Sequence, residues 1–312
     1  MARTGLVLAG GGAKGAYQVG VIEYLAERDV RVAAVAGTSI GALNGAVLTS
    51  SDSLRAAAVR LRALWDEVGR TADAGGRPAT LVEVARMATG PVVRPDFVED
   101  LMEHHVDLGR LPLDLPFWVT MFPALPPMPF HPDGDWLADL ARAASGAQAH
   151  WVKVNDLPVP ERRQAVLASA ALPIIMPGRW VGGTFYRDGG LGGMYANAPA
   201  GPLVTEGELD LILVTHLTRG VLWDAQRFPN ATILEIRPSE ALNGPGLLNS
   251  TAGLLDFSAR RLEGLREQGY QDARRTLERA GDVLDAAYVA REAQDVMLDA
   301  VGKLDDDLAE EQ

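Results

Sequence analysis

The chain has 312 residues, of which 47% are apolar, and it carries a formal net charge of −12 at pH 7 with a pI near 4.9. The high apolar fraction excludes a disordered chain. The negative net charge argues against nucleic acid as a partner and disfavours electrostatic docking on anionic lipid. Because the chain contains no cysteine, it has neither disulfides nor thiolate metal sites, and we expect no metal and no cofactor.

The first 50 residues predict an alternation of strands and helices. The order is a strand over 4–9, a helix over 15–28, a strand over 31–36 and a helix over 41–50. This βαβα order predicts a parallel sheet with right-handed crossovers. No stretch has the apolar length of a membrane span, and glycines interrupt the apolar core that a signal peptide would need. We therefore expect a cytoplasmic protein.

The middle of the chain changes character. Helices are predicted over 53–69 and 79–88. Residues 110–135 are dense in proline and large apolar side chains, which excludes a central helix there but allows a short strand near 116–122. This segment is interpreted as a lid, a lipid-contacting rim or a partner surface, or else as a buried packing loop. Further strands are predicted over 150–154, 183–187, 210–217 and 231–236, and the 210–217 strand is apolar enough to be buried on both faces.

From residue 250 onward the apolar residues recur at helical spacing. A break at Gly281-Asp282 predicts two helices, which would cover the sheet. We therefore expect one main domain over residues 1–280 and a C-terminal helical extension over 281–312 that ends in a solvated acidic tail.

The pentapeptide Gly37-Thr38-Ser39-Ile40-Gly41 lies between a predicted strand and a predicted helix. A serine at the apex of such a sharp turn exposes its hydroxyl, and a Cβ on either flanking position would clash. Ser39 is therefore a candidate nucleophile. The alternative is a plain turn between strand and helix.

The glycine loop over residues 10–15 (Gly-Gly-Gly-Ala-Lys-Gly) follows the first strand. It fits the spacing of a dinucleotide fingerprint, but the next strand ends at Gly37 without the acidic residue that would hold a ribose. It also fails as a P-loop, because Gly15 follows Lys14 where that motif needs serine or threonine.

A third interpretation of this loop is an oxyanion hole. Consecutive glycines at a helix N-terminus present unblocked backbone N–H groups, and the helix dipole adds partial positive charge. If the first two strands are parallel neighbours, Gly10, Gly11 and Gly12 lie beside Ser39. A tight turn without a ligand is the alternative.

A serine nucleophile needs a positioned base, and the chain offers two kinds. His216 fits the order Ser, acid, His of an ordinary α/β-hydrolase, but a histidine in a buried strand is usually a hydrogen-bonded core residue. Asp188 lies in a turn signature, Asp-Gly-Gly, and burial would raise its pKa toward that of a useful base. We favour Asp188 and place all five histidines outside the chemistry: His104, His105, His131, His150 and His216.

Together, these motifs resemble those of the patatin-like phospholipases, a family of lipid acyl hydrolases. The resemblance rests on the glycine loop at 10–15, the serine pentapeptide at 37–41, the segment Ala168–Pro177 and the Asp-Gly-Gly at 188–190, followed by Asn197 and Pro199. Gly269-Tyr270 and Ala273-Arg274 are similar to a late helix of the family. The spacing from Asp188 to Asn197 is longer than the family pattern, and residues 110–135 are richer in proline and aromatics.

The resemblance implies a three-layer modified α/β-hydrolase fold, with a central, mainly parallel sheet flanked by helices. It also implies a Ser39–Asp188 dyad that works through an acyl-enzyme, an oxyanion hole at Gly10, Gly11 and Gly12, and a lipid or acyl-ester substrate reached by at most transient contact with a membrane surface. Lys14 would assist the loop or meet a lipid phosphate. Two alternatives stay open: a histidine-dependent esterase or thioesterase, and a non-catalytic module that binds acyl groups or anions.

Overall fold

The computed structural model describes residues 3–74, 95–112, 114–128, 135–173, 176–206, 209–220, 222–243 and 253–282. The chain divides into a large unit over residues 1–272 and a second unit that begins at residue 273. The sheet and every candidate site residue lie in the first unit. The predicted extension over 281–312 lies almost wholly outside the described residues, so that division stays a prediction.

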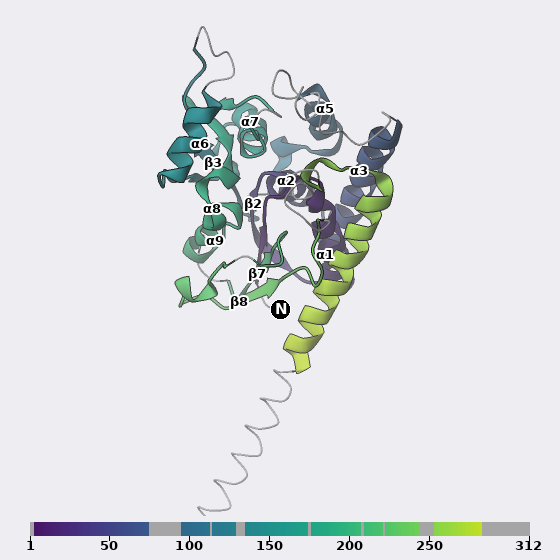
Figure 1. Ribbon diagram of the computed structural model, residues 1–312. Coiled ribbons are helices and arrows are strands. Elements are labelled where there is room, and N and C mark those ends of the chain that lie inside the picture. The colour runs from purple at the N-terminus through teal and green to yellow at the C-terminus, as the bar shows by residue number, and fades with distance from the viewer. Residues whose placement is uncertain are drawn as a thin grey trace, which may run out of the picture. The chain divides into compact units, whose positions relative to one another are not determined.

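The first unit is built on a mixed, mostly parallel sheet of eight strands, shown in Figure 1. The order is β5-β6-β3-β2-β1-β7-β8, with β4 also paired to β3. Strands β3, β2, β1, β7 and β8 run parallel, whereas β4, β5 and β6 form antiparallel pairs. The strands are β1 Thr4–Leu8, β2 Val32–Thr38, β3 Phe117–Pro123, β4 His150–Lys153, β5 Arg179–Val181, β6 Thr184–Asp188, β7 Leu211–Thr215 and β8 Ile233–Ile236.

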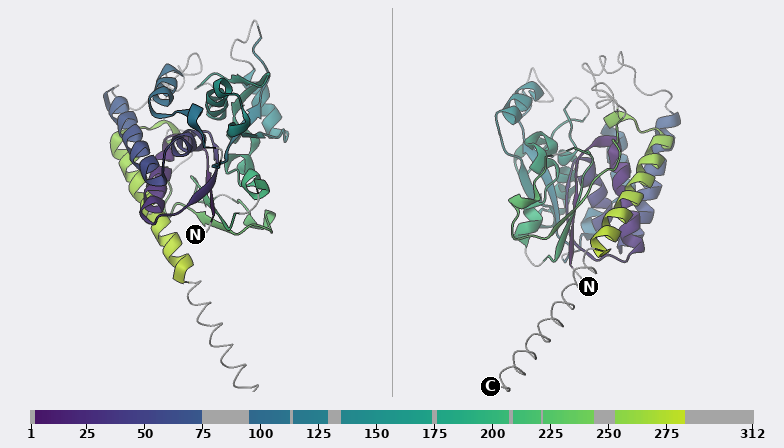
Figure 2. Two further views of the ribbon diagram at one scale, coloured as in Figure 1. Left: turned by 180° about the vertical axis from the view of Figure 1, so that it is seen from behind. Right: turned by 60° about the horizontal axis from the view of Figure 1, so that its bottom comes forward.

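Helices lie on both sides of this sheet, and the views in Figure 2 show the strands between them. The mixed sheet between helices confirms the predicted fold class. The central strands are buried on both faces, as a covered parallel sheet requires. The helices are α1 Gly15–Glu27, α2 Ile40–Thr49, α3 Leu54–Ala74, α5 Pro95–His105, α6 Trp136–Ala144, α7 Val159–Ser169, α8 Met194–Asn197 and α9 Gly201–Glu206, followed by a helix over 259–282.

Most predicted strands are present within a residue or two of their expected bounds, and so are the first three helices, although α3 extends to Ala74. The helix predicted over 79–88 lies outside the described residues. The last helix runs through Gly281 and Asp282, where the sequence predicted a break, and the second predicted helix lies outside the described residues.

The proline-rich segment contains a central strand of the sheet. β3 pairs with β2, β4 and β6, and its side chains Phe117, Val119, Met121 and Phe122 are buried. This part of residues 110–135 is therefore packing, as the second interpretation proposed. Met128 is exposed at the end of this stretch, and residues 129–134 lie outside the described residues.

Helices α5, α6, α7, α8 and α9 and strand β5 were not predicted from the sequence. The physical reason is clearest for α7, whose buried residues run consecutively from Ala165 to Ser169. A helix end that is buried all round lacks the apolar stripe by which amphipathic helices are recognised. The other missed elements, α5 apart, are shorter than ten residues.

Candidate active site

Ser39 occupies the apex of a turn between β2 and α2. Its backbone has φ 56° and ψ −125°, in the left-handed region that an L residue adopts only under strain. The residue as a whole is half-buried. The order of strand, strained turn and helix is that of a nucleophile elbow, as the pentapeptide predicted.

The two glycines of the pentapeptide allow this turn to pack closely. A Cβ on Gly41 would lie 2.0 Å from the carbonyl oxygen of Leu8, and a Cβ on Gly37 would lie 2.5 Å from that of Gly41. Both distances are far below a van der Waals contact. The missing side chain at Gly41 therefore lets the elbow lie against β1, and the one at Gly37 lets the turn itself close tightly.

The glycine loop lies beside Ser39, as predicted. Strands β1 and β2 are parallel neighbours and Leu8 pairs with Gly37, so the segments that follow them leave the sheet at the same edge. A Cβ on Gly10 would lie 3.1 Å from the Cβ of Ser39. Backbone groups of this loop can therefore face a group bound at the serine.

Gly10 differs from the expectation that all three glycines donate to an oxyanion. Its N–H donates to the carbonyl oxygen of Asn197 at 3.1 Å, and its own carbonyl accepts from Nδ2 of Asn197 at 3.3 Å. The Gly10 N–H is thus already used to fix the loop. No hydrogen bond within the described residues takes up the N–H groups of Gly11 or Gly12.

A buried network of neutral side chains holds both ends of the glycine loop. Gln18 donates to the carbonyl of Ala9 at 2.7 Å, and Asn44 donates to the carbonyl of Gly15 at 3.1 Å. Asn44 also donates to Gln18 and accepts from the indole N–H of Trp65, at 2.9 Å in each case. Because every member is buried and paired, the network fixes the loop on α1, α2 and α3.

Asp188 ends β6 and is 3% exposed. Its Oδ1 accepts the N–H of Gly190 at 2.8 Å, while Oδ2 is buried and accepts no hydrogen bond from any described residue. Burial raises the pKa of this carboxyl to about 6, and the nearby Ser39 hydroxyl and the Gly190 N–H lower it by smaller amounts. The Ser39 hydroxyl therefore lies close enough to the Asp188 carboxyl to influence its charge, and an open contact between two such groups is common in sites without substrate.

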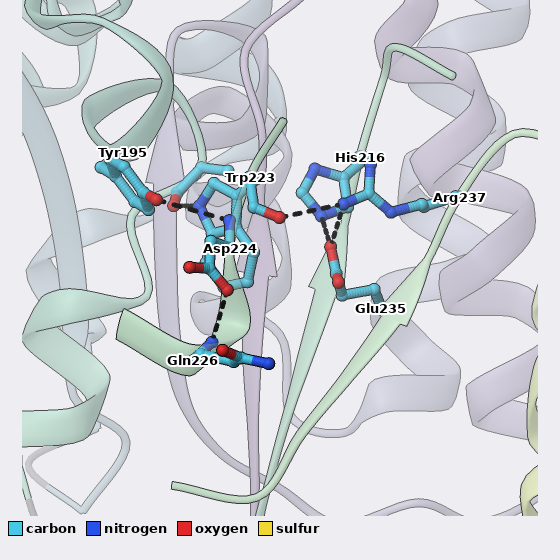
Figure 3. A network of polar contacts seen from close by, with 8 residues as sticks. Tyr195, His216, Trp223, Asp224, Gln226, Glu235 and Arg237 are labelled. Atoms are coloured by element: carbon cyan, nitrogen blue, oxygen red, sulfur yellow. Dashed lines mark hydrogen bonds and ion pairs between the residues drawn. The ribbon is translucent and has the colours of Figure 1, made fainter. Parts of the chain in front are cut away.

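His216 belongs to a different group of polar residues, shown in Figure 3. Its Nε2 lies 2.6 Å from Oε2 of Glu235 on β8, and Arg237 also pairs with Glu235. Burial, followed by the charge of Arg237, lowers the pKa of His216 to about 3. Within the described part of the chain, no hydrogen bond joins His216 to Ser39 or Asp188.

The other described histidines have partners of their own. Nδ1 of His104 lies 2.6 Å from the Asp100 carbonyl, His105 contacts Glu67, and His150 contacts the Tyr186 hydroxyl. His131 lies outside the described residues.

Lys14 lies under the glycine loop. Its side chain is 7% exposed, and a Cβ on Gly11 would lie 3.0 Å from its Cε. Burial, followed by the positive charge of Arg261, lowers the pKa of Lys14 to about 8. The ammonium group therefore stays mostly protonated at pH 7.

Sequence reasoning missed the residues that support the site, above all Ser169. Its Oγ accepts the backbone N–H of Ser39 at 3.0 Å across 130 positions of sequence. The motif around Ser169 marked the segment, but only the fold brings its hydroxyl to the elbow. The same holds for Gln18 and Asn44, which are polar residues inside otherwise apolar helices.

This arrangement is suited to acyl transfer. It combines a half-buried serine at a strained turn, a buried carboxyl with a raised pKa and two backbone N–H groups, at a helix N-terminus, that no described residue accepts from. Among the described residues, no three His, Asp or Glu side chains gather to hold a metal ion. In the same residues, no helix combines the length and hydropathy that a membrane crossing needs.

Comparison with known proteins identifies a family. A sequence profile described as Patatin-like phospholipase matches residues 6–204, which is more than half of the chain. The chain is 58% identical over 43 residues to "Lysophospholipase nte1" of Aspergillus terreus, and 39% identical over 89 residues to "Lysophospholipase NTE1" of Mycosarcoma maydis. These matches span 14% and 28% of this chain but only 3% and 4% of those much longer proteins.

Two solved structures are also similar to this one. VipD from Legionella pneumophila has a TM-score of 0.45 and 15% identity, over 89% of this chain and 67% of VipD. The type III effector ExoU has a TM-score of 0.41 and 16% identity, over 89% of this chain and 53% of ExoU.

Proposed function

This chain belongs to the patatin-like phospholipase family, and we propose that it hydrolyses carboxylic esters of lipids through an acyl-enzyme on Ser39. The observation that carries the proposal is the proximity of a serine in a strained turn to a buried carboxyl whose pKa is raised to about 6. The similarity to two lysophospholipases supports a lipid as the substrate. A cytoplasmic location with transient membrane contact stays a prediction from the sequence.

In the proposed first step, Asp188 acts as the general base. A carboxyl with a pKa near 6 is mostly ionised at pH 7 and is more basic than an ordinary aspartate. Oδ2 takes the proton of the Ser39 hydroxyl as Oγ attacks the ester carbonyl. The proton then passes to the leaving alcohol, and the acyl group remains on Ser39.

The proposed oxyanion donors are the N–H groups of Gly11 and Gly12, since that of Gly10 is bonded to Asn197. Two fixed backbone donors at a helix N-terminus stabilise the tetrahedral oxyanion without reorganisation, and losing one such donor typically costs about 3–4 kcal/mol. In the second half of the reaction, Asp188 takes a proton from water as the water attacks the acyl carbonyl. The bond between the acyl carbon and Oγ then breaks, Asp188 returns the proton to Oγ of Ser39, and the fatty acid leaves.

We propose Lys14 as a contact for a lipid phosphate. The side chain lies under Gly11, beside the proposed oxyanion donors, and carries a charge next to that of Arg261. Two neighbouring cations favour an anionic ligand, because its charge relieves their repulsion.

The two alternatives make different demands on the site. A histidine-dependent esterase needs His216 to reach the serine, but the Nε2 of this histidine is bonded to Glu235. A non-catalytic module that binds acyl groups or anions needs only the glycine loop and gives no role to the raised pKa of Asp188. We therefore keep the dyad as the proposal.

The test measures how fast the purified protein hydrolyses p-nitrophenyl butyrate and lysophosphatidylcholine. We expect hydrolysis by the wild-type chain and its loss in Ser39→Ala. The matched control is Ser145→Ala, which removes an exposed serine hydroxyl that donates to the Arg142 carbonyl and should leave the rate unchanged. Equal rates in Ser39→Ala and the wild type would refute the proposal.

A further inference from the structure

The end of α7 and the turn after it bond to the backbones of both proposed dyad residues. The N–H of Ser39 donates to Oγ of Ser169 at 3.0 Å, and the N–H of Asp188 donates to the carbonyl of Ala171 at 3.0 Å. Ser169 and Ala171 are fully buried, so water does not compete for these bonds. A three-residue segment thus connects the nucleophile to the base.

Resting on the proposed function, we propose that Ser169 is a positioning residue: its hydroxyl holds Ser39 in the backbone conformation that directs Oγ toward Asp188. A serine with φ 56° and ψ −125° keeps that conformation only where its surroundings enforce it. As the residue before the first turn of α2, Ser39 has no helical acceptor for its N–H, and the Ser169 hydroxyl supplies one.

The positions next to Ser169 cannot replace it, because Ala168 and Ala170 have no side-chain acceptor. Without the hydroxyl, the N–H of Ser39 loses its partner and the strained turn can relax. Ser39 would then shift relative to the carboxyl of Asp188, whose pKa its hydroxyl lowers. Proton transfer depends steeply on that approach, so a small displacement has a large kinetic effect.

The test compares Ser169→Ala with the wild-type chain on p-nitrophenyl butyrate over a range of pH. We expect kcat to fall about 10- to 100-fold while KM stays within about twofold. The acid limb of kcat/KM should also move upward from about pH 6, because a displaced Ser39 hydroxyl no longer lowers the pKa of Asp188. A residue with only a structural role would lower the yield of folded protein without moving this limb.

The matched control is Thr49→Val, which removes a fully buried hydroxyl on α2 that donates to carbonyls of its own helix, those of Gly45 and Ala46. Its kcat should stay within about twofold of the wild type. An unchanged kcat and acid limb in Ser169→Ala, or an equal loss in Thr49→Val, would overturn the inference.

Two further outcomes are distinguishable. If Ser169→Ala does not fold, the test uses Ser169→Cys, which keeps a side chain of similar size with a weaker acceptor. Its kcat should fall less than that expected for Ser169→Ala. A wild-type kcat in Ser169→Cys would overturn the inference. If the wild-type chain itself has no esterase activity, the proposed function fails and this inference fails with it. Activity that is equal in the wild type and in the Ser169 variants refutes only the positioning role.

Discussion

Asp188 and His216 are two buried ionisable residues at or next to the ends of strands of the same sheet, β6 and β7, but their surroundings differ. Burial moves both toward the neutral form, because it raises the pKa of Asp188 to about 6 and lowers that of His216 to about 3. His216 has its Nε2 bonded to Glu235, whereas Asp188 lies near the Ser39 hydroxyl and its Oδ2 accepts no hydrogen bond from the described part of the chain. A shifted pKa alone therefore does not single out a base, and our proposal of Asp188 rests on the shifted pKa together with the proximity of Ser39.

The largest expected effect is that of Asp188→Asn. The amide keeps the shape of the side chain and an oxygen for the Gly190 N–H but cannot take a proton at neutral pH. We expect kcat/KM for p-nitrophenyl butyrate to fall about 10³- to 10⁴-fold, the upper range for loss of a general base. A fall of less than tenfold would mean that another group activates Ser39.

The pH dependence of kcat/KM should show an acid limb near pH 6. Below this pKa, Asp188 is protonated and cannot accept the serine proton, so the rate falls about tenfold for each further pH unit. The measurement is initial-rate kinetics in buffers of constant ionic strength. An acid limb near pH 4 would show that the Asp188 carboxyl has an ordinary pKa. Asp188 would then no longer differ from His216 in the way described above.

The two residues should also affect stability with opposite dependence on pH. The folded-state pKa of Asp188 is raised, so protonation stabilises the fold and this stability is lost as the pH rises from about 4 to 6. The folded-state pKa of His216 is lowered, so the unfolded chain binds more protons between about pH 3 and 6.5 and stability rises with pH.

Urea unfolding between pH 4 and 6 separates these contributions. Relative to the wild type, Asp188→Asn should become more stable as the pH rises, and His216→Gln should become less stable. Each change should be up to about 1.4 kcal/mol per pH unit. Changes of the same sign in both variants would contradict the assigned pKa shifts.

A smaller effect is expected from Lys14→Gln. If Lys14 contacts a lipid phosphate, kcat/KM for lysophosphatidylcholine should fall about tenfold while that for uncharged p-nitrophenyl butyrate changes less than about threefold. Arg219→Gln, on an exposed loop, provides a control for loss of one positive charge. An equal fall for both esters would assign Lys14 to holding the loop.

The sequence was most informative where the site is local. The pentapeptide around Ser39 contains its own strand, turn and helix, and its glycines are required by close contacts within and beside that unit. The neighbouring glycine loop followed from parallel pairing of two consecutive strands. Short-range pattern and topology were sufficient for these features.

The features that the sequence did not predict depend on contacts between distant segments. The Gly10 N–H is used by Asn197, and the Ser39 N–H by Ser169, across 187 and 130 positions. Helix α7, which supplies Ser169, has no apolar stripe because its end is buried all round. Such positions are set by tertiary packing, which a single sequence does not reveal.

The most direct test of the dyad is the rate at which a fluorophosphonate probe labels Ser39 at pH 7, measured by mass spectrometry of the peptide that contains it. This reaction depends on activation of the serine and not on the choice of lipid. We predict that Asp188→Asn slows labelling by about 10³-fold or more and that His216→Gln labels within about twofold of the wild-type rate. Slow labelling in His216→Gln with a normal rate in Asp188→Asn would contradict the account.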